Sequence, residues 1–266
     1  MKFALTIFSS LIFLSSIAQN NIVSEVGYTF YINNGNATVT TDCSLIHFHD
    51  LKKSTFINFG FKDIPEESTT KKTNVDGVEE IKIDKYDNDE GQKPEYQKDF
   101  AKDSLWSFEN IYGEKKYHII KEDLPKLKWN IQNDTKQIIG ISTQKATIKF
   151  RGREYEAWFA PTIQINNGPF KFHGLPGLIL EIRSLDNSYR FEAYKLNLFK
   201  KEENLVTFKV LTEKYNKAPE VDIKEKLALV KKNEDKEVKY QLSRNPNITE
   251  YKIQNNSIEK EFPNFQ

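Results

Sequence analysis

The sequence predicts an α+β fold that is mainly β: one large curved antiparallel sheet or half-barrel with one late helix. Three observations support this prediction. Apolar and polar residues alternate in several stretches, Phe and Tyr are abundant (19 and 12 residues), and Asn- and Gly-containing turns separate the alternating stretches. Helical periodicity is credible only after residue 220. A β-sandwich is the alternative architecture.

Composition limits the class of protein. The chain has 266 residues, and 39 Lys and Arg balance 38 Asp and Glu, which leaves a formal net charge of +1. This balance argues against a general nucleic-acid binder or a binder of anionic membranes. A single cysteine excludes an intrachain disulfide framework.

The N-terminus has the pattern of a secretory signal peptide. One lysine precedes an apolar run from Phe3 to Leu14, and the small residues Ser16 and Ala18 suit cleavage after Ala18. We therefore expect residues 1–18 to be a signal peptide and residues 19–266 to form a single β-rich domain, periplasmic or secreted. The apolar run is too short for a comfortable membrane span, and no later segment qualifies.

Two strands are expected at the start of the mature chain. Asn21–Ile32 alternates, with a bulge near Glu25, and an Asn-Gly turn leads into a returning strand over Ala37–His49.

Three potential metal ligands share one face of that returning strand: Cys43, His47 and His49. Thiolate and imidazole suit zinc or copper, so a metal-binding protein using these residues is one alternative. Leu45 lies between them and no fourth ligand is evident. The main interpretation is therefore a half-exposed strand face with a packed cysteine, without a metal or other cofactor.

The next stretch, residues 62–96, is polar and charged, and we expect a mobile insertion around one short strand near Val78–Ile83. A hairpin follows, with strands over Leu105–Tyr112 and Lys115–Lys121. Near the end of the chain, Tyr189–Leu198 reads as a strand whose alternation changes phase, which is typical of a bulge. Val221–Lys232 is the expected helix, and the polar tail after it is expected to fray in part.

The most informative stretch is central. Lys145–Arg151 alternates as a half-buried strand, and Gly152 marks a hairpin turn before a return strand that ends at Phe159. Exposed cross-strand ion pairs are the simple interpretation of its charges, each contributing under about 1 kcal/mol. Binding of an anion or a partner by Arg151 and Arg153 is the alternative.

A glycine- and proline-rich loop follows this hairpin. Gly174-Leu175-Pro176-Gly177 predicts a tight reversal at which the backbone packs closely, with Leu175 as a plug if it points inward. The loop contains no hydroxyl, thiol or carboxylate. It also lacks the lysine and Ser/Thr that follow the glycines of a phosphate-binding loop.

These motifs resemble the GLPGLI family of Bacteroidota envelope proteins. The resemblance is carried by the intact hexapeptide at Gly174–Ile179, by Arg151–Tyr155 before Ala157-Trp158-Phe159, by Gly168–Phe172, and by Lys53–Phe56 and Trp129–Ile131 further upstream. It implies a role in the cell envelope and carries no established activity. Relatives commonly have a cysteine before the Lys-Ala of the first strand, where this chain has Gln144, so no thiol-based role is transferred.

The preferred function is a non-catalytic binding or assembly protein of the bacterial envelope. A curved sheet with a concave aromatic face can hold an apolar ligand, a peptide or a partner's strand. The candidate binding residues are Arg151, Arg153, Trp158, Gly168, Pro169, Phe170, His173, Gly174, Leu175, Pro176 and Gly177. For Trp158 and Phe170, core packing is the competing role. The alternative is an envelope enzyme using His173, oriented by Glu181 or Asp186, although the usual hydrolase motifs are lacking.

Overall fold

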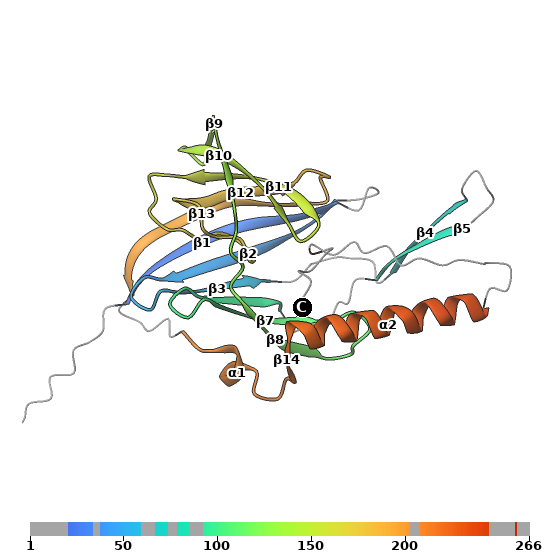
Figure 1. The fold of residues 1–266 in the computed structure, drawn as a ribbon. Helices are drawn as coiled ribbons and strands as arrows, with labels where there is room; N and C mark the ends of the chain where they lie inside the picture. Colours follow the sequence, from blue (N-terminus) through green and yellow to red (C-terminus); the bar gives the residue numbers. More distant parts are fainter. Residues whose placement is uncertain are drawn as a thin grey trace, which may run out of the picture.

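The computed structural model contains one open sheet of twelve strands (Figure 1). It describes residues 21–33, 38–59, 67–73, 79–85, 93–202, 208–244 and 259, so the predicted signal peptide lies outside the described residues. In spatial order the strands are β14 (Glu220–Asp222), β8 (Tyr117–Asp123), β7 (Ser104–Asn110), β6 (Glu95–Asp99), β3 (Lys53–Asn58), β2 (Thr38–Phe48), β1 (Asn21–Asn33), β13 (Tyr189–Glu202), β12 (Leu178–Ser184), β11 (Arg153–Ala160), β10 (Ile141–Phe150) and β9 (Asn130–Ile138).

The predicted fold class is confirmed. Strand neighbours are antiparallel, apart from the parallel pair of β14 with β8. The predicted bulge also forms, because the register of β1 against β13 shifts between Val23 and Glu25. A second shift, between Gly27 and Tyr28, leaves Tyr194 of β13 unpaired in the register, where the alternation of the sequence changes phase.

The polar stretch of residues 62–96 differs from the prediction in two ways. It holds two strands, β4 (Glu67–Thr73) and β5 (Glu79–Lys85), which pair with each other as a separate sheet. Its last two residues already belong to β6, whose five side chains are all buried. Hydropathy cannot reveal such a strand, because its polar side chains are buried with hydrogen-bond partners such as those of Lys98. Residues 62–66, 74–78 and 86–92 of the stretch lie outside those described.

The late helix is longer than predicted. A short helix α1 (Leu211–Lys214) comes first, and α2 spans Ile223–Arg244. Its first turn buries Ile223 against Ile111 and Ile120, while its later part extends away from the sheet (Figure 1). That later part is rich in Lys and Glu, which favour helix without supplying an apolar stripe. Among the described residues, no helix is both long and apolar enough to cross a membrane.

The sheet curves so that strands near its two ends face each other. The Glu122 carboxylate, on β8, contacts the guanidinium of Arg151 from the turn between β10 and β11, although these strands lie far apart in the sheet order. Residues 124–129 connect β8 to β9 and therefore cross from one end of the sheet to the other. The main apolar core lies inside this curve, between β1, β2, β3 and β10–β13.

Candidate functional site

The hairpin of β10 and β11 turns through two residues that both have positive φ, Arg151 at 46° and Gly152 at 76°. Phe150 pairs with Arg153 across this turn. Two positive φ angles are the signature of a type I′ turn, whose twist suits a β-hairpin. The turn brings the side chain of Arg151 to the gap between the two ends of the sheet, where it lies only 7% exposed.

The loop between β11 and β12, residues 161–177, fills the inside of the curve. Phe170, Phe172 and Leu175 are buried, and the ring of Phe172 lies 5.5 Å from that of Phe150 and 4.8 Å from that of Tyr155. Leu175 is 0% exposed, so it is the inward plug that the sequence indicated. The concave face that was expected to hold a ligand is therefore occupied by the chain itself.

Two glycines of the loop are required by close packing. A Cβ at Gly177 would lie 2.2 Å from the carbonyl oxygen of Ala160, and a Cβ at Gly168 would lie 2.8 Å from Cδ1 of Ile179. Any side chain at Gly177 would force the backbone to move. The motif residue Ile179 is also fixed by its carbonyl, which accepts a hydrogen bond from the hydroxyl of Tyr28 at 2.7 Å.

A buried lysine from β6 holds the loop from one side. The Nζ of Lys98 donates to Oδ1 of Asn167 and to the carbonyls of Gly168 and Phe172, each at 2.8 Å. Burial lowers the pKa of Lys98 well below its ordinary value. The three oxygen acceptors oppose this shift, because only the ammonium form can donate three hydrogen bonds. The lysine replaces water as the donor for the loop's inward-facing carbonyls.

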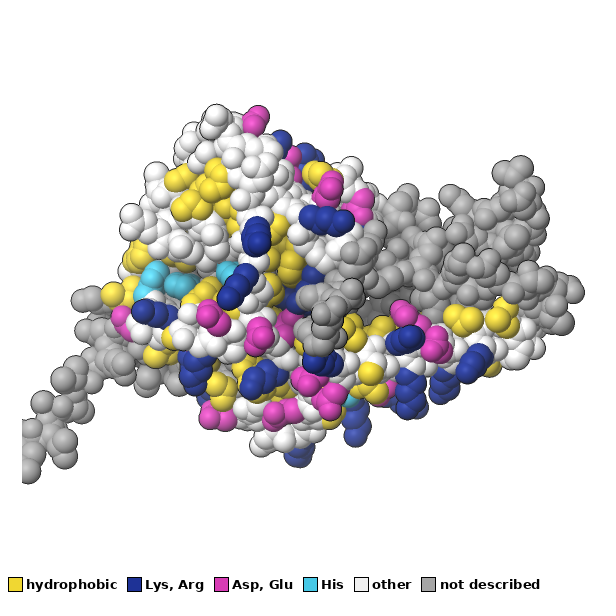
Figure 2. All heavy atoms as spheres, in the orientation of Figure 1, with side chains coloured by type: hydrophobic (Ala, Val, Ile, Leu, Met, Phe, Trp, Pro, Cys, Tyr) yellow, Lys and Arg dark blue, Asp and Glu magenta, His cyan; other side chains and the backbone are white. Residues whose placement is uncertain are grey.

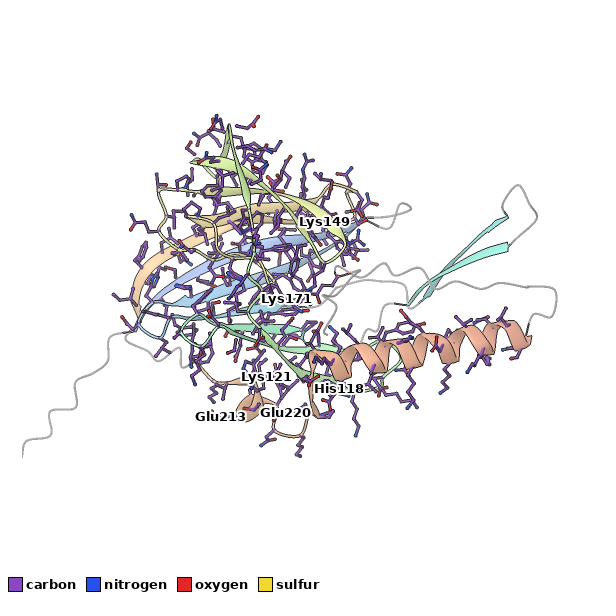
Figure 3. The ribbon with its side chains drawn as sticks, viewed as in Figure 1. His118, Lys121, Lys149, Lys171, Glu213 and Glu220 are labelled. Carbon is purple, nitrogen blue, oxygen red and sulfur yellow. The ribbon has the colours of Figure 1, made fainter. Side chains whose placement is uncertain are left out.

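A second lysine, Lys171 of the loop itself, takes part in a ring of four alternating charges. Its Nζ lies 2.6 Å from Oε1 of Glu122 and 2.9 Å from Oε2 of Glu259. The other oxygen of Glu259 lies 2.7 Å from Nη1 of Arg151, and Nη2 of Arg151 contacts Glu122 to close the ring. Figure 3 shows Lys171 near the middle of the molecule. We call Glu122, Lys171, Glu259 and Arg151 the charge ring.

The charge ring keeps its members ionised despite their burial. Burial alone would lower the pKa of Lys171, but Glu259 and Glu122 raise this pKa above its ordinary value. Burial alone would likewise raise the pKa of Glu122, but Lys171 and Arg151 hold it below its ordinary value. Two carboxylates and two cations leave no net charge, which is the condition under which buried charges are tolerated.

A cleft of about 1010 Å³ opens beside the charge ring, between β8, residues 124–128, the turn after β10 and the start of α2. Its apolar lining residues are Leu124, Pro125, Leu127, Ile148, Phe150 and Ile223. Its basic lining residues outnumber its acidic ones, Glu122, Asp123 and Asp222, by two to one; they are Lys121, Lys126, Lys128, Lys149, Lys224 and Arg151. In Figure 3, Lys149 and Lys121 appear on opposite sides of Lys171.

The proposed metal ligands do not converge. Cys43 is 0% exposed within the apolar core, where burial and the nearby Asp42 raise the pKa of its thiol. The ring centroids of His47 and His49 lie 4.7 Å apart. Figure 2 shows histidine side chains gathered on the face of the molecule that it displays. Within the described ranges, no three His, Cys, Asp or Glu side chains are placed to share a metal ion.

His173 contacts neither of the acids suggested for it. Its carbonyl accepts a hydrogen bond from Nε1 of Trp129 at 2.8 Å, and its ring lies 5.9 Å from that of Phe100. Glu181 instead pairs with a lysine, Lys136, and Asp186 pairs with Arg153. Among the described residues, neither Glu181 nor Asp186 is placed to orient the imidazole of His173.

The remaining predicted residues have packing or surface roles. Arg153 is buried against Asp186 rather than open to a ligand. Trp158 is 9% exposed, donates from Nε1 to Glu156 at 3.0 Å, and lies under the ammonium of Lys136. Phe170 stacks edge-on with Tyr96. We call the loop of residues 161–177 the motif loop; within it, Gly174 and Pro176 are exposed and Pro169 is buried.

Sequence reasoning missed Lys98, which supports the loop from β6, the charge-ring residues Glu122, Lys171 and Glu259, and the lysines around the cleft. One signal could have pointed to Lys171, because it stands between two aromatic residues in a stretch with strong core character. Nothing local marks Glu259, whose partners lie 88 and 108 residues earlier in the chain.

Comparison with known proteins adds one family match and a distant structural likeness. A family model described as "Protein of unknown function (Porph_ging)" matches residues 150–181, which run from the end of β10 through the motif loop into β12. Comparison with curated proteins gives no match. The segment that holds Arg151, Lys171 and the two close-packed glycines thus carries the signature of an uncharacterised family.

The solved structures similar to this chain include two of PNGF-II. In the P21 crystal form the identity is 14% and the TM-score 0.46, over 80% of this chain and 34% of PNGF-II. In the C2 form the identity is 13% and the TM-score again 0.46, over 80% and 33% of the two chains. This chain therefore spans about a third of the length of the structures it matches.

Proposed function

We propose that the protein is a non-catalytic binding protein of the bacterial cell envelope whose cleft holds an elongated ligand with an apolar body and an anionic group. The observation that carries this proposal is the cleft of about 1010 Å³ with its apolar walls and exposed lysines. Its size is at the upper end of ligand-binding pockets, which enclose about 300–1,000 Å³.

The lining chemistry supports both parts of the ligand. Leu127, Phe150 and Ile223 would remove apolar surface of the ligand from water, at about 25 cal/mol per Å² buried. The exposed lysines at the cleft would attract the anionic group and give the ligand its orientation. Because the motif loop fills the concave face, we place the ligand in this cleft instead.

The first test is ligand recovery and binding. Protein purified from envelope extract is analysed by native mass spectrometry, and dodecanoate is then titrated into delipidated protein by calorimetry. We expect a co-purifying amphiphile and saturable binding of dodecanoate. Leu127→Trp, which fills the cleft, should reduce the affinity at least tenfold. Tyr240→Trp, on the exposed later part of α2, is the matched control. The proposal is refuted if the protein is recovered without a ligand and both variants bind dodecanoate equally weakly. If a peptide is recovered, the ligand of the cleft is a peptide and not an amphiphile.

The family and cellular location belong to the same proposal. We infer that residues 1–18 direct export, that residues 19–266 form one exported domain, and that the chain is a GLPGLI-type protein. The matched segment 150–181 contains the Gly174–Ile179 hexapeptide, which supports the last inference. Fractionation and the intact mass of the mature protein test the first two. A cytoplasmic protein that retains Met1–Ala18 would contradict export.

A further inference from the structure

Two arginines lie side by side on the face of the sheet that points away from the main core. Arg183 of β12 and Arg190 of β13 are directly opposite in the strand register, beside the buried pair of Ile182 and Phe191. Because side chains alternate along a strand, the arginines project from the outer face, and their side chains are 43% and 42% exposed. Like charges that face each other across a pair of strands are destabilising, so this pair by itself lowers the stability of the sheet.

Each guanidinium is oriented by its own neighbours. Nε and Nη2 of Arg183 lie 3.1 and 3.0 Å from one oxygen of Glu156, a residue that is only 7% exposed. Cζ of Arg190 lies 4.0 Å from the ring centroid of Tyr31 on β1, and its Nη2 lies 3.4 Å from Oε2 of Glu192. Nη1 of either arginine has no partner within the described part of the chain. Each Nη1 carries two N–H groups, so oriented donors remain for another molecule.

Both arginines line a pocket of about 230 Å³. Its other lining residues include Thr38 at the start of β2, Glu181 of β12 and Asn187 of the turn between β12 and β13. None of the described residues that line this pocket is aliphatic, in contrast to the cleft beside the charge ring. The pocket is smaller than the sites of drug-sized ligands, which enclose about 300–1,000 Å³. It therefore suits a small and strongly polar ligand.

The charges around the pocket favour an anion. The ion pairs on this part of the outer face join four cations to three carboxylates, which leaves one positive charge over. The cations are Lys136, Lys145, Arg183 and Arg190, and the carboxylates are those of Glu156, Glu181 and Glu192. An anion between the two guanidiniums also replaces their mutual repulsion by attraction to a shared partner.

The donor geometry indicates a phosphate group. A planar guanidinium presents a fork of N–H groups that matches the oxygens of a phosphate or a carboxylate. A carboxylate has two oxygens and one charge, whereas a phosphate monoester has three terminal oxygens and close to two negative charges at neutral pH. Three oxygens can accept hydrogen bonds from both forks at once. Thr38, Glu181 and Asn187 line the same pocket and offer hydrogen-bonding groups to hydroxyls on the rest of the ligand.

We propose that Arg183 and Arg190 bind the phosphate group of a small hydroxylated phosphate ester, such as a sugar phosphate, on the outer face of the sheet. The stacking on Tyr31 and the pairing with Glu156 hold both guanidiniums before the ligand arrives, which limits the side-chain entropy lost on binding. The pocket shares no lining residue with the cleft, so this site is independent of the ligand proposed there.

Binding is tested by calorimetry on the full chain at constant ionic strength, with inorganic phosphate, glucose 6-phosphate and glucose as probes. We expect saturable binding of both phosphates, about tenfold tighter for glucose 6-phosphate because its hydroxyls add hydrogen bonds, and no detectable binding of glucose. Equal affinities of the two phosphates would contradict the hydroxylated body of the ligand.

Arginine variants locate the binding. Arg183→Gln and Arg190→Gln should each weaken the binding of glucose 6-phosphate by about tenfold or more, because each removes one charged fork. Arg244→Gln, at an exposed arginine in the last turn of α2, is the matched control and should bind like the wild type. Binding that all three variants retain equally, or the lack of saturable binding to the wild type, would overturn the proposal.

A stability measurement separates a ligand site from a structural role. In sodium chloride, Arg190→Gln should unfold at a Tm no lower than that of the wild type, because it relieves the repulsion from Arg183 and loses only exposed contacts. Glucose 6-phosphate should raise the Tm of the wild type and of Arg244→Gln, but not that of Arg190→Gln. If Arg190→Gln lowers the Tm in sodium chloride and still responds to glucose 6-phosphate as the control does, Arg190 is a structural residue and the proposal fails.

Discussion

Two fully buried lysines hold the motif loop in place, and their charges are accommodated in different ways. Lys98 reaches the loop from β6 and donates only to uncharged oxygens of Asn167, Gly168 and Phe172. Lys171 belongs to the loop and lies between two carboxylates. Burial lowers the pKa of Lys98. The carboxylates of Glu259 and Glu122 instead raise the pKa of Lys171.

The two lysines differ in the kind of partner that they bind: uncharged oxygens for Lys98 and carboxylates for Lys171. The partners of Lys98 are loop atoms, two of them backbone carbonyls, so nothing outside the packed core can replace them. The partners of Lys171 are carboxylates, Glu122 of β8 and Glu259, which follows Lys171 by 88 residues. The loop is thus joined to β6 through uncharged oxygens and to β8 through an ion pair.

The largest expected effect is that of Lys171→Met. It leaves Glu122 and Glu259 with Arg151 as their remaining ring partner, and breaking a buried ion network costs about 3–5 kcal/mol of stability. The measurement is the free energy of unfolding in urea. Lys171→Arg, which keeps the charge, is the matched control and should lose less. A loss under about 1 kcal/mol for Lys171→Met would show that the charge ring is not a buried network.

Lys98→Met should cost less than Lys171→Met. It removes a donor from the carbonyls of Gly168 and Phe172, at about 1–3 kcal/mol for each carbonyl left unsatisfied, whereas Oδ1 of Asn167 still accepts from the backbone N–H of Gly168. Removing a desolvated cation offsets part of this cost. Urea unfolding of both variants in parallel gives the order directly. The contrast between the two lysines breaks down if Lys98→Met is the more destabilised protein.

The pKa values of two histidines, His47 and His173, depend on the charge of Lys98. Burial lowers the pKa of His47 and of His173 from 6.5 to about 4; the positive charge of Lys98 adds to this shift at both residues, after that of His49 at His47. The unfolded chain therefore binds protons at these residues between pH 6.5 and 4 when the folded chain does not. Their contribution to stability is lost as the pH falls through this range. For one histidine, the loss of stability at pH 5.5 relative to a pH well above 6.5 is about 1.4 kcal/mol.

NMR titration of the histidine rings checks this prediction. In the wild type both residues should titrate near pH 4. In Lys98→Met both pKa values should rise, because the nearby positive charge is gone, whereas Lys171→Arg should leave them unchanged. Unchanged values in Lys98→Met would mean that Lys98 carries no proton in this pH range.

The smallest effect is expected at a partly exposed ion pair between two neighbouring strands. Lys145 lies 3.0 Å from Glu156 on the neighbouring strand and is 24% exposed. Glu156 also holds Arg183 and Trp158, so Lys145→Ala leaves the carboxylate with partners and should cost under about 1 kcal/mol. A loss as large as that of Lys171→Met would remove the distinction between buried and exposed pairs. Urea unfolding is again the measurement.

Local sequence patterns predicted what local physics determines. The β10–β11 hairpin follows from alternation and from one glycine at a turn that needs positive φ, and β1, β2, β7 and β8 were expected from the same rules. The beginning of α2 was found because Ile223 starts an apolar side. Its later turns were not, because a helix that leaves the sheet has no periodic apolar face.

The candidate site could not be read from the sequence, because it depends on partners that are distant in the chain. β6 reads as a polar segment, yet Lys98 is buried since the loop at residues 167–172 supplies its acceptors. Glu259 resembles any glutamate of a polar tail until Lys171 and Arg151 are placed beside it. The motif glycines were recognised, but they serve close packing and the chemistry lies in their neighbour Lys171.

The seam between β1 and β13 also has a consequence for how the chain is made. It pairs Asn21 with Glu202 and lies in the middle of the sheet order, and it joins residues farther apart in sequence than any other pair of strands in the sheet, β14 with β8 included. A growing chain can assemble its two wings early, but the long edge of β1 stays without a neighbour until residue 202 has emerged. Such late, long-range closure slows folding and leaves an edge open to wrong pairing. The nascent protein is therefore expected to need a holding chaperone until its two wings join.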